Sequence, residues 1–199
     1  MNKMRYDQMR PLLQTGDIVL FSGKGPISTG IKFATGSKWS HVGMVFVLPE
    51  YDFVCIWEST TLSSITDLDT NKAKKGVQLV PLRERVNQYQ GEIAVRKLQG
   101  VDLNAVALNR LNQLRKELSA RPYEQNKIEL IKSAYDGPLG LNQACLSSLF
   151  CSELVAEAYQ RLGLIDEFSP SNEYTPADFS KSSVSLLRGS LGPAVTLTL

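Results

Sequence analysis

Two short apolar runs, far apart in the chain, hold the residues that most constrain its fold. The only histidine, His41, stands in Trp-Ser-His-Val-Gly-Met-Val at 39–45, and Cys151 begins the run Cys-Ser-Glu-Leu-Val at 151–155. The first run predicts a strand and the second a helix. A thiol and an imidazole are the minimum parts of a thiol nucleophile with its base. A fold that uses both must bring an early strand against a late helix.

The composition is that of one globular domain. With 199 residues the chain is long enough for one sizeable core and short for two, so a single domain over residues 1–199 is expected. The net charge of +2 comes without a basic block, so nucleic-acid binding is not expected. No window reaches the ~18 apolar residues of a membrane span and no signal peptide is recognisable, which predicts no stable membrane anchor and a cytoplasmic location. Three cysteines, an odd number, fit a reducing compartment.

Hydrophobic patterns along the chain predict several short strands and fewer helices. Strands are expected at 17–21, 40–47, 53–59, 77–80, 92–97 and, more weakly, 194–199. Leucines at helical spacing predict a helix over 103–119 with Asp102 as its cap. A further short helix is expected at 126–134.

The two strand patterns on either side of Pro49 predict a hairpin that pairs His41 with an acidic residue. Residues 48–51 would form a four-residue loop, because Pro49 cannot continue a paired strand. With this loop, His41 lies directly opposite Glu58 and both side chains project from the same face of the sheet. The carboxylate would then fix the tautomer of the imidazole and stabilise its charged form.

The segment around Cys151 predicts the best-defined helix of the chain. Ser147 or Ser148 would cap its start and Gly163 would close its end. Cys151 would then lie in the first turn, where unpaired backbone amides and the helix dipole favour a thiolate. We therefore expect Cys151 to be the reactive thiol.

Each of these residues also has a commoner explanation. A lone histidine on a strand is usually a packed or exposed residue, a cysteine on an apolar stripe is usually a small core residue, and Glu58 would be a surface charge. A zinc site made of Cys55, Cys145, Cys151 and His41 is a further alternative, although Cys-x5-Cys departs from the usual spacing of zinc ligands. Because of this spacing we expect no metal, and no cofactor is expected either. Cys55 would point away from His41 and Cys145 lies in a segment without a clear period, so Cys151 is the preferred nucleophile.

Several runs taken together resemble the NlpC/P60 cysteine peptidase family. Thr-Gly-Asp-Ile-Val-Leu-Phe at 15–21, Ser-His-Val-Gly-Met-Val at 40–45 and Ile-Trp-Glu-Ser at 56–59 are similar to the second half of that domain. Arg-Pro-Tyr at 121–123 and Phe-Cys-Ser-Glu-Leu-Val at 150–155 are similar to its first half. The halves stand in reverse order, as in the circularly permuted branch of the superfamily, and the cysteine run is most similar to the YiiX/YaeF-like group.

The resemblance implies roles for individual residues. It implies Cys151 as nucleophile, His41 as base and Glu58 as the group that orients the base. Tyr123 matches a family tyrosine beside the nucleophile, which implies a donor to the oxyanion together with the backbone N–H of Cys151. Asp17 matches an acidic position of the family, but a hydrogen-bonding role at a turn or strand start is expected for it.

Two departures from the family pattern limit what the resemblance implies. Residues 61–100 cannot be placed on the family core and are expected to form an insertion. The segment 124–126 reads Glu-Gln-Asn where cell-wall members often have Gly-Gly, which weakens any expectation of a peptidoglycan substrate.

We therefore expect an α+β papain-like fold in permuted NlpC/P60 order, with an antiparallel sheet or small barrel packed on the helix of the nucleophile. The predicted function is a cysteine-dependent hydrolase that cleaves an amide bond through an acyl-enzyme. The polar segments 22–38 and 61–75 would flank the groove, and their lysines and hydroxyls suit a peptide-like or amide substrate. No feature of the sequence sets the oligomeric state.

Two alternatives to this function stay open. One is a thiol acyltransferase or lipase that acts on lipid esters, as in the lecithin retinol acyltransferase-like branch. That branch usually orients its base with a second histidine or another polar residue, whereas Glu58 stands here. The other is a binding module that keeps the groove and has lost turnover.

Overall fold

A curled, mostly antiparallel sheet forms the centre of the protein. The structure is a computed structural model that describes residues 2–119, 142–181 and 184–199, with the backbone path alone for 142–150. Within these ranges, seven strands lie in the order β1 (Lys3–Arg5), β11 (Val195–Thr198), β8 (Gly91–Arg96), β2 (Ile18–Gly23), β3 (His41–Leu48), β4 (Phe53–Thr60) and β7 (Gly76–Pro81). Neighbouring strands are antiparallel except β1 and β11, which run parallel.

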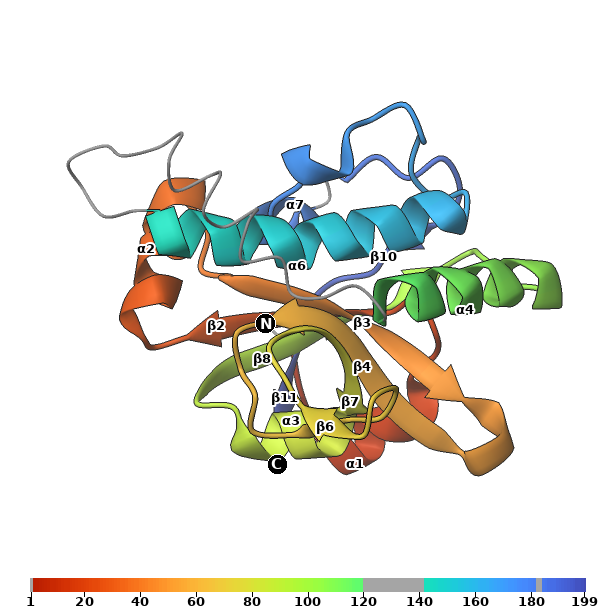
Figure 1. Cartoon of the computed structure of the whole chain (residues 1–199), viewed down its shortest axis with the longest axis horizontal. Coiled ribbons are helices and arrows are strands. Elements are labelled where there is room, and N and C mark those ends of the chain that lie inside the picture. Colours follow the sequence, from red (N-terminus) through yellow and green to blue (C-terminus); the bar gives the residue numbers. More distant parts are fainter. Residues whose placement is uncertain (1, 120–141, 182–183) are drawn as a thin grey trace.

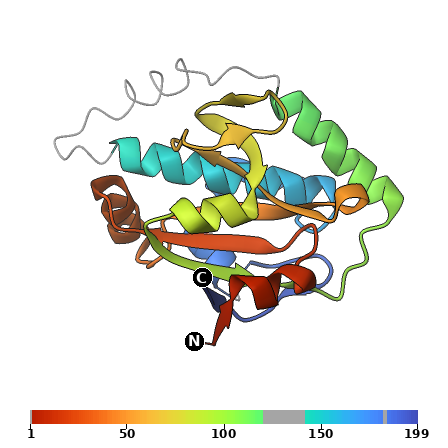
Figure 2. The same ribbon diagram turned by 90° about the horizontal axis from the view of Figure 1, so that it is seen from below.

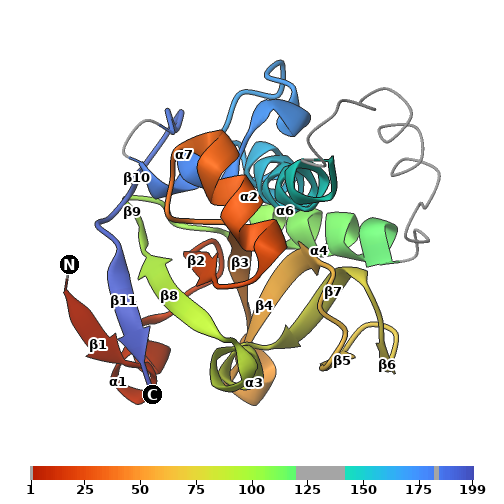
Figure 3. The ribbon, with the colours of Figure 1, turned by 90° about the vertical axis from the view of Figure 1, so that its left-hand side faces the viewer.

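Helices cover both sides of this sheet (Figures 1 and 3). The long helix α6 (Asn142–Arg161) lies on one side, with α2 (Pro26–Thr35), α4 (Ala105–Ser119) and α7 (Pro176–Ser180) beside it. On the other side lie α1 (Tyr6–Met9) and α3 (Leu82–Gln88), which are in front of the sheet in Figure 2. The remaining short elements are η1 (Arg10–Leu12), η2 (Pro49–Tyr51), η3 (Ser171–Glu173) and the two-stranded pairs β5 (Thr66–Asp67) with β6 (Lys72–Ala73) and β9 (Leu98–Gln99) with β10 (Ser190–Leu191).

Two hydrophobic clusters pack on the two faces of the sheet, because successive strand side chains point to opposite faces. The first joins Val42, Met44 and Phe46 of β3 to Cys151, Leu154 and Val155 of α6. The second fills the opposite, concave face. It includes Val80 of β7 and Leu197 of β11, from strands far apart in the sheet order, so the sheet curls strongly. Among the described strands, β1 and β7 are the two free ends of that order.

Most elements expected from the sequence are present. The predicted strands correspond to β2, β3, β4, β7, β8 and β11. The predicted helix over 103–119 is α4, but Asn104 rather than Asp102 caps it, since Asn104 Oδ1 accepts a hydrogen bond from the Ala107 N–H at 3.0 Å. The helix expected at 126–134 lies outside the described residues.

Part of the segment 61–100, which was expected to be an insertion, belongs to the main sheet. Both β7 and β8 pair with other strands of that sheet, and their apolar residues contribute to its two cores. The small hairpin of β5 and β6, between β4 and β7, forms a separate sheet, and β9 at the end of the segment pairs with β10 in another.

The predicted register of the β3–β4 hairpin is wrong by two residues. Leu48 pairs with Phe53 and Met44 with Trp57, so the four-residue loop starts at Pro49 rather than at Leu48. Asp52 ends this loop in the left-handed conformation, with φ of 43°. A shift of two residues preserves the face of every side chain, whereas a shift of one would reverse it.

The predicted start of the helix that contains Cys151 is also wrong. Instead of starting at Ser147 or Ser148, α6 starts at Asn142, so Cys151 lies in the middle of the helix. The segment 142–150 has no glycine or proline and includes alanine, glutamine and leucines, which are good helix formers. The helix dipole and its unpaired amides therefore do not act on the thiol, and the Cys151 N–H lies within the helical hydrogen-bond ladder.

Gly43 provides the space that allows β3 and β4 to approach at the site. A Cβ at this position would lie 2.7 Å from Ile56 Cδ1 and 3.2 Å from Glu58 Cβ. We expect Gly43→Ala to lower the free energy of unfolding by about 1–3 kcal/mol, because these buried neighbours must move. Urea denaturation of the variant measures this loss.

The matched control is Gly25→Ala. A Cβ at Gly25 would have no neighbour within 4 Å, and the residue has an ordinary φ of −75°. We expect this variant to keep the stability of the parent protein. Equal stability of the two variants would contradict the close approach described for Gly43.

Candidate active site

His41 is the first residue of β3, and its surroundings fix the direction of its ring. The preceding Ser40 donates its backbone N–H to the Phe21 carbonyl at 2.9 Å, and its hydroxyl accepts a hydrogen bond from the Gly23 N–H at 3.3 Å. The His41 ring packs against Phe21, with ring centroids 5.2 Å apart. The start of the strand is therefore anchored to β2 before the imidazole extends from it.

Glu58 holds one edge of the imidazole. His41 Nε2 and Glu58 Oε2 are 2.6 Å apart, and the two residues lie diagonally on neighbouring strands. The Glu58 side chain is fully buried, whereas that of His41 keeps 15% of its surface exposed. The predicted placement of the two side chains on the same face is confirmed, although the pairing is diagonal and not direct.

A buried arginine, which sequence reasoning did not identify, holds the other oxygen of the same carboxylate. Arg85 Nε donates to Glu58 Oε1 at 2.6 Å, and the Arg85 side chain is only 1% exposed. It comes from α3, a helix that the hydrophobic patterns of the sequence did not predict. Leu82 and Val86, one helical turn apart, were the signal for that helix, since both are buried in the concave core.

Cys151 lies on the other side of the imidazole. The residue has no exposed surface and packs in the cluster between α6 and the sheet. Burial acts to lower the pKa of His41, but the charge and hydrogen bond of Cys151, together with those of Glu58, raise it from 6.5 to about 10. His41 is therefore protonated at neutral pH, between a thiol and a carboxylate.

The carboxylate of this group stays ionised in spite of its burial. Burial acts to raise the pKa of Glu58, but the hydrogen bond and charge of His41 and the charge and hydrogen bond of Arg85 lower it below the usual 4.5. Glu58 thus carries its negative charge at neutral pH and lies between two cations.

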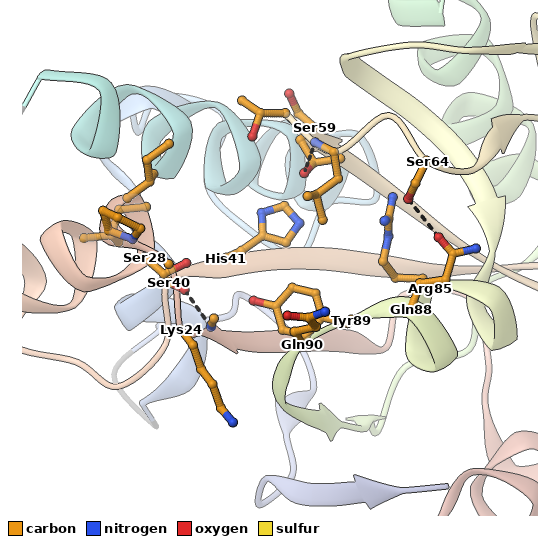
Figure 4. A pocket seen from close by; sticks show the side chains of 18 residues that line it. Lys24, Ser28, Ser40, His41, Ser59, Ser64, Arg85, Gln88, Tyr89 and Gln90 are labelled. Carbon is orange, nitrogen blue, oxygen red and sulfur yellow. Dashed lines mark hydrogen bonds between the residues drawn. The ribbon is translucent and has the colours of Figure 1, made fainter.

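A cavity of about 420 Å³ opens beside the exposed edge of His41 (Figure 4). In this view Arg85 and Tyr89 lie beside the imidazole, while the side chain of Lys24 points away. Burial raises the pKa of Tyr89 to about 12, so its hydroxyl keeps its proton. Hydroxyl groups are frequent in the lining and come from Ser28, Ser40, Ser59, Thr60, Thr61 and Ser64. Residues of both polar segments expected to flank the groove, 22–38 and 61–75, therefore line it.

The described residues that line the cavity carry no carboxylate, and Cys151 is not among them. Of the two residues, His41 is therefore the one that the cavity exposes to a bound molecule.

The remaining candidate residues are Tyr123, Cys145, Cys55 and Asp17. Tyr123 lies outside the described residues, as does the side chain of Cys145. Burial raises the pKa of Cys55 to about 12, and its side chain belongs to the core. Across the described ranges, no three His, Cys, Asp or Glu side chains gather as metal ligands. Asp17 accepts hydrogen bonds from the Gln14 and Leu98 N–H groups, which is the turn role expected for it.

Comparisons with known proteins give one family. A family model described as a permuted papain-like amidase enzyme, YaeF/YiiX, C92 family, matches residues 12–173. Among solved structures, the crystal structure of metalloprotein yiiX from Escherichia coli O157:H7 is similar, with 21% identity, coverage of 93% of this chain and 96% of that chain, and a TM-score of 0.48. The comparison with curated proteins gives no match.

None of the helices that the structure describes combines the length and hydrophobicity needed to cross a membrane.

The lowered pKa of Glu58 predicts how stability depends on pH. Because this pKa is lower in the folded than in the unfolded chain, the unfolded chain takes up the proton first as the pH falls below 4.5. The stabilisation is therefore complete above 4.5 and is lost as the pH falls through the folded pKa. We expect Glu58→Gln to lose this acid-dependent component and to show a shallower fall in melting temperature between pH 5 and the acid limit of folding. Parallel acid slopes for the two proteins would contradict the assignment.

Proposed function

The chain belongs to the C92 family of permuted papain-like amidases, and on this premise we propose that it hydrolyses an amide bond with Cys151 as nucleophile and His41 as general base and acid. The observation that carries the proposal is the position of His41 between the thiol and the Glu58 carboxylate. That residues 1–199 form a single domain stays a prediction.

The proton arrangement supports this division of roles. Glu58 occupies Nε2, so Nδ1 is the ring nitrogen left to exchange a proton with the thiol. An imidazolium beside a thiol favours the thiolate, which is the reactive form of cysteine. Because Cys151 lies in the middle of α6, this activation rests on His41 and not on the helix dipole.

The reaction follows from these roles. The Cys151 thiolate adds to the carbonyl carbon of the amide, and the electron pair of the C=O bond moves to oxygen. When this intermediate collapses, the C–N bond breaks, His41 gives its proton to the leaving nitrogen, and a thioester remains. His41 then takes a proton from water, the hydroxide adds to the thioester, and the carboxylic acid leaves as the thiolate and imidazolium form again.

Donors to the oxyanion have to come from outside the described site. We expect the Tyr123 hydroxyl to be one of them, since the Cys151 N–H lies inside a helix and is used there. A Tyr123→Phe variant should then lose turnover while its KM stays nearly constant, because an oxyanion donor acts mainly in the transition state.

The cavity beside His41 favours a polar amide substrate. Its hydroxyls and the amides of Gln88 and Gln90 offer donors and acceptors to peptide-like groups. A lipid chain would leave these polar groups without partners, which is unfavourable when they are buried.

Three probes test the proposal: an activated amide, an ester and a thioester that all carry the same short polar acyl group. We expect the protein to form an acyl-enzyme with them. The intact protein should gain the mass of one acyl group, and peptide mapping should place it on Cys151. Cys151→Ala and His41→Ala should show no gain, and Glu58→Gln should react more slowly.

The matched control is Cys55→Ala, which removes another buried thiol of the same core. Cys55 is not among the groups that shift the pKa of His41, so this variant should react like the parent protein. Labelling that depends on Cys55, or that is unchanged in His41→Ala, would contradict the assignment. Release of fatty acid from phospholipid vesicles that depends on Cys151, with no reaction of the amide probe, would instead favour the lipid acyltransferase or lipase.

A further inference from the structure

We propose that Arg85 is a positioning residue of the active site, which acts on His41 through Glu58. This inference rests on the proposed thiol chemistry of Cys151 and His41. It starts from an unbroken row of contacts, in which Arg85 Nε meets Glu58 Oε1 at 2.6 Å and Glu58 Oε2 meets His41 Nε2 at 2.6 Å.

The two contacts together fix the Glu58 carboxylate. Each oxygen has a single strong partner, and the partners lie on different elements, Arg85 on α3 and His41 on β3. A carboxylate held at one oxygen alone can turn about its terminal bond, whereas one held at both oxygens keeps one plane. The imidazole edge that it binds is then held in the same plane.

Arg96, another buried arginine of the described residues, has a structural role that differs from the role of Arg85. Arg96 spreads its donors over four backbone carbonyls, those of Phe179, Lys181, Leu191 and Gly192, and so ties the C-terminal segment to β8. Among the described residues, Arg85 has Glu58 as its hydrogen-bond partner, and its Nη2 is buried without one. Its burial therefore serves the carboxylate and not the backbone.

Stability alone does not explain such a pair. Replacing a buried ion pair by apolar side chains of similar volume is often neutral or stabilising, because the cost of removing two charges from water offsets their attraction. The charge of Arg85 does have an effect at the site, since it is among the interactions that keep Glu58 ionised. Loss of this charge would leave a buried carboxylate that protonates more easily and holds the imidazolium less firmly.

The test measures the pH dependence of Cys151 alkylation by iodoacetamide in the full-length protein, which needs no identified substrate. Alkylation requires the thiolate, the thiolate is favoured by the imidazolium, and the imidazolium is stabilised by an ionised Glu58. In Arg85→Met the acid limb of the rate profile should move up by about one pH unit or more. Arg85→Lys keeps the positive charge but loses the planar guanidinium group. It should therefore shift the acid limb of the rate profile by less than half as much as Arg85→Met does.

The matched control is Arg83→Met, on the same short helix. Arg83 is 63% exposed and pairs with Asp7 at 3.0 Å, away from Glu58. Its removal should leave the alkylation profile in place. A shift as large as that of Arg85→Met would show that the profile responds to any loss of positive charge on α3, and would overturn the proposal.

A double-mutant comparison separates positioning from general damage. If Arg85 acts through Glu58, adding Arg85→Met to Glu58→Gln should cause no further shift of the alkylation profile. The double variant removes both charges of the buried pair, so it leaves neither of them unpaired and should fold. The hydrogen-bonded Nε2–H proton of His41, resolved by NMR, should be present in Arg83→Met and lost or weakened in Arg85→Met.

Two results would overturn the inference. These are an unshifted profile with an intact Nε2–H resonance in Arg85→Met, or equal shifts from Arg85→Met with and without Glu58. If Cys151 of the parent protein is alkylated no faster than an ordinary buried thiol at any pH, the proposed function fails first and the role of Arg85 fails with it.

Discussion

The buried carboxylate of Glu58 is the constraint on which the rest of the site depends. It has no contact with solvent, and each of its oxygens lies 2.6 Å from a cationic group, Arg85 on one side and His41 on the other. An isolated buried carboxylate would protonate, but this one is kept ionised by its partners. The ionised carboxylate in turn raises the pKa of His41, and Cys151 raises it as well.

The fold supplies this arrangement from three separate parts of the chain. The sheet places His41 and Glu58 on one face, and Gly43 leaves the space for Glu58 between the strands. Helix α6 brings Cys151 to the far side of the imidazole, and α3 closes the other end of the row with Arg85. The two helices lie on opposite sides of the sheet (Figure 3), and the side chains of the site meet near the end of β3, where His41 lies.

The sequence was sufficient to predict the contact between His41 and Glu58, but not the exact register of β3 against β4. The turn signal at Pro49 predicted a four-residue loop, and the loop of the structure has this length but begins one residue later. Because this displaces the strand pairing by two residues, the period of the strand, the face predicted for Glu58 is still correct. The predicted start of α6 was wrong because two signals compete in this segment. The serines at 147 and 148 are good helix caps, but the residues before them also favour a helix, and the helix starts at Asn142. Arg85 was missed because no local pattern shows that a charged residue on a short helix will be buried against a distant carboxylate. Tyr123 stays a prediction, since it lies outside the described residues.

The most direct test of the account is the titration of His41 by NMR. The chain has one histidine, so protein labelled with ¹⁵N-histidine and free of a histidine tag gives a single imidazole whose resonances need no assignment. The account predicts that the ring stays protonated through neutral pH and titrates at about 10, and that Cys151→Ala, which removes the first group that raises this value, lowers it. A His41 that titrates near 6.5, in the parent protein and in Cys151→Ala alike, would contradict the proton arrangement from which the proposed chemistry is derived.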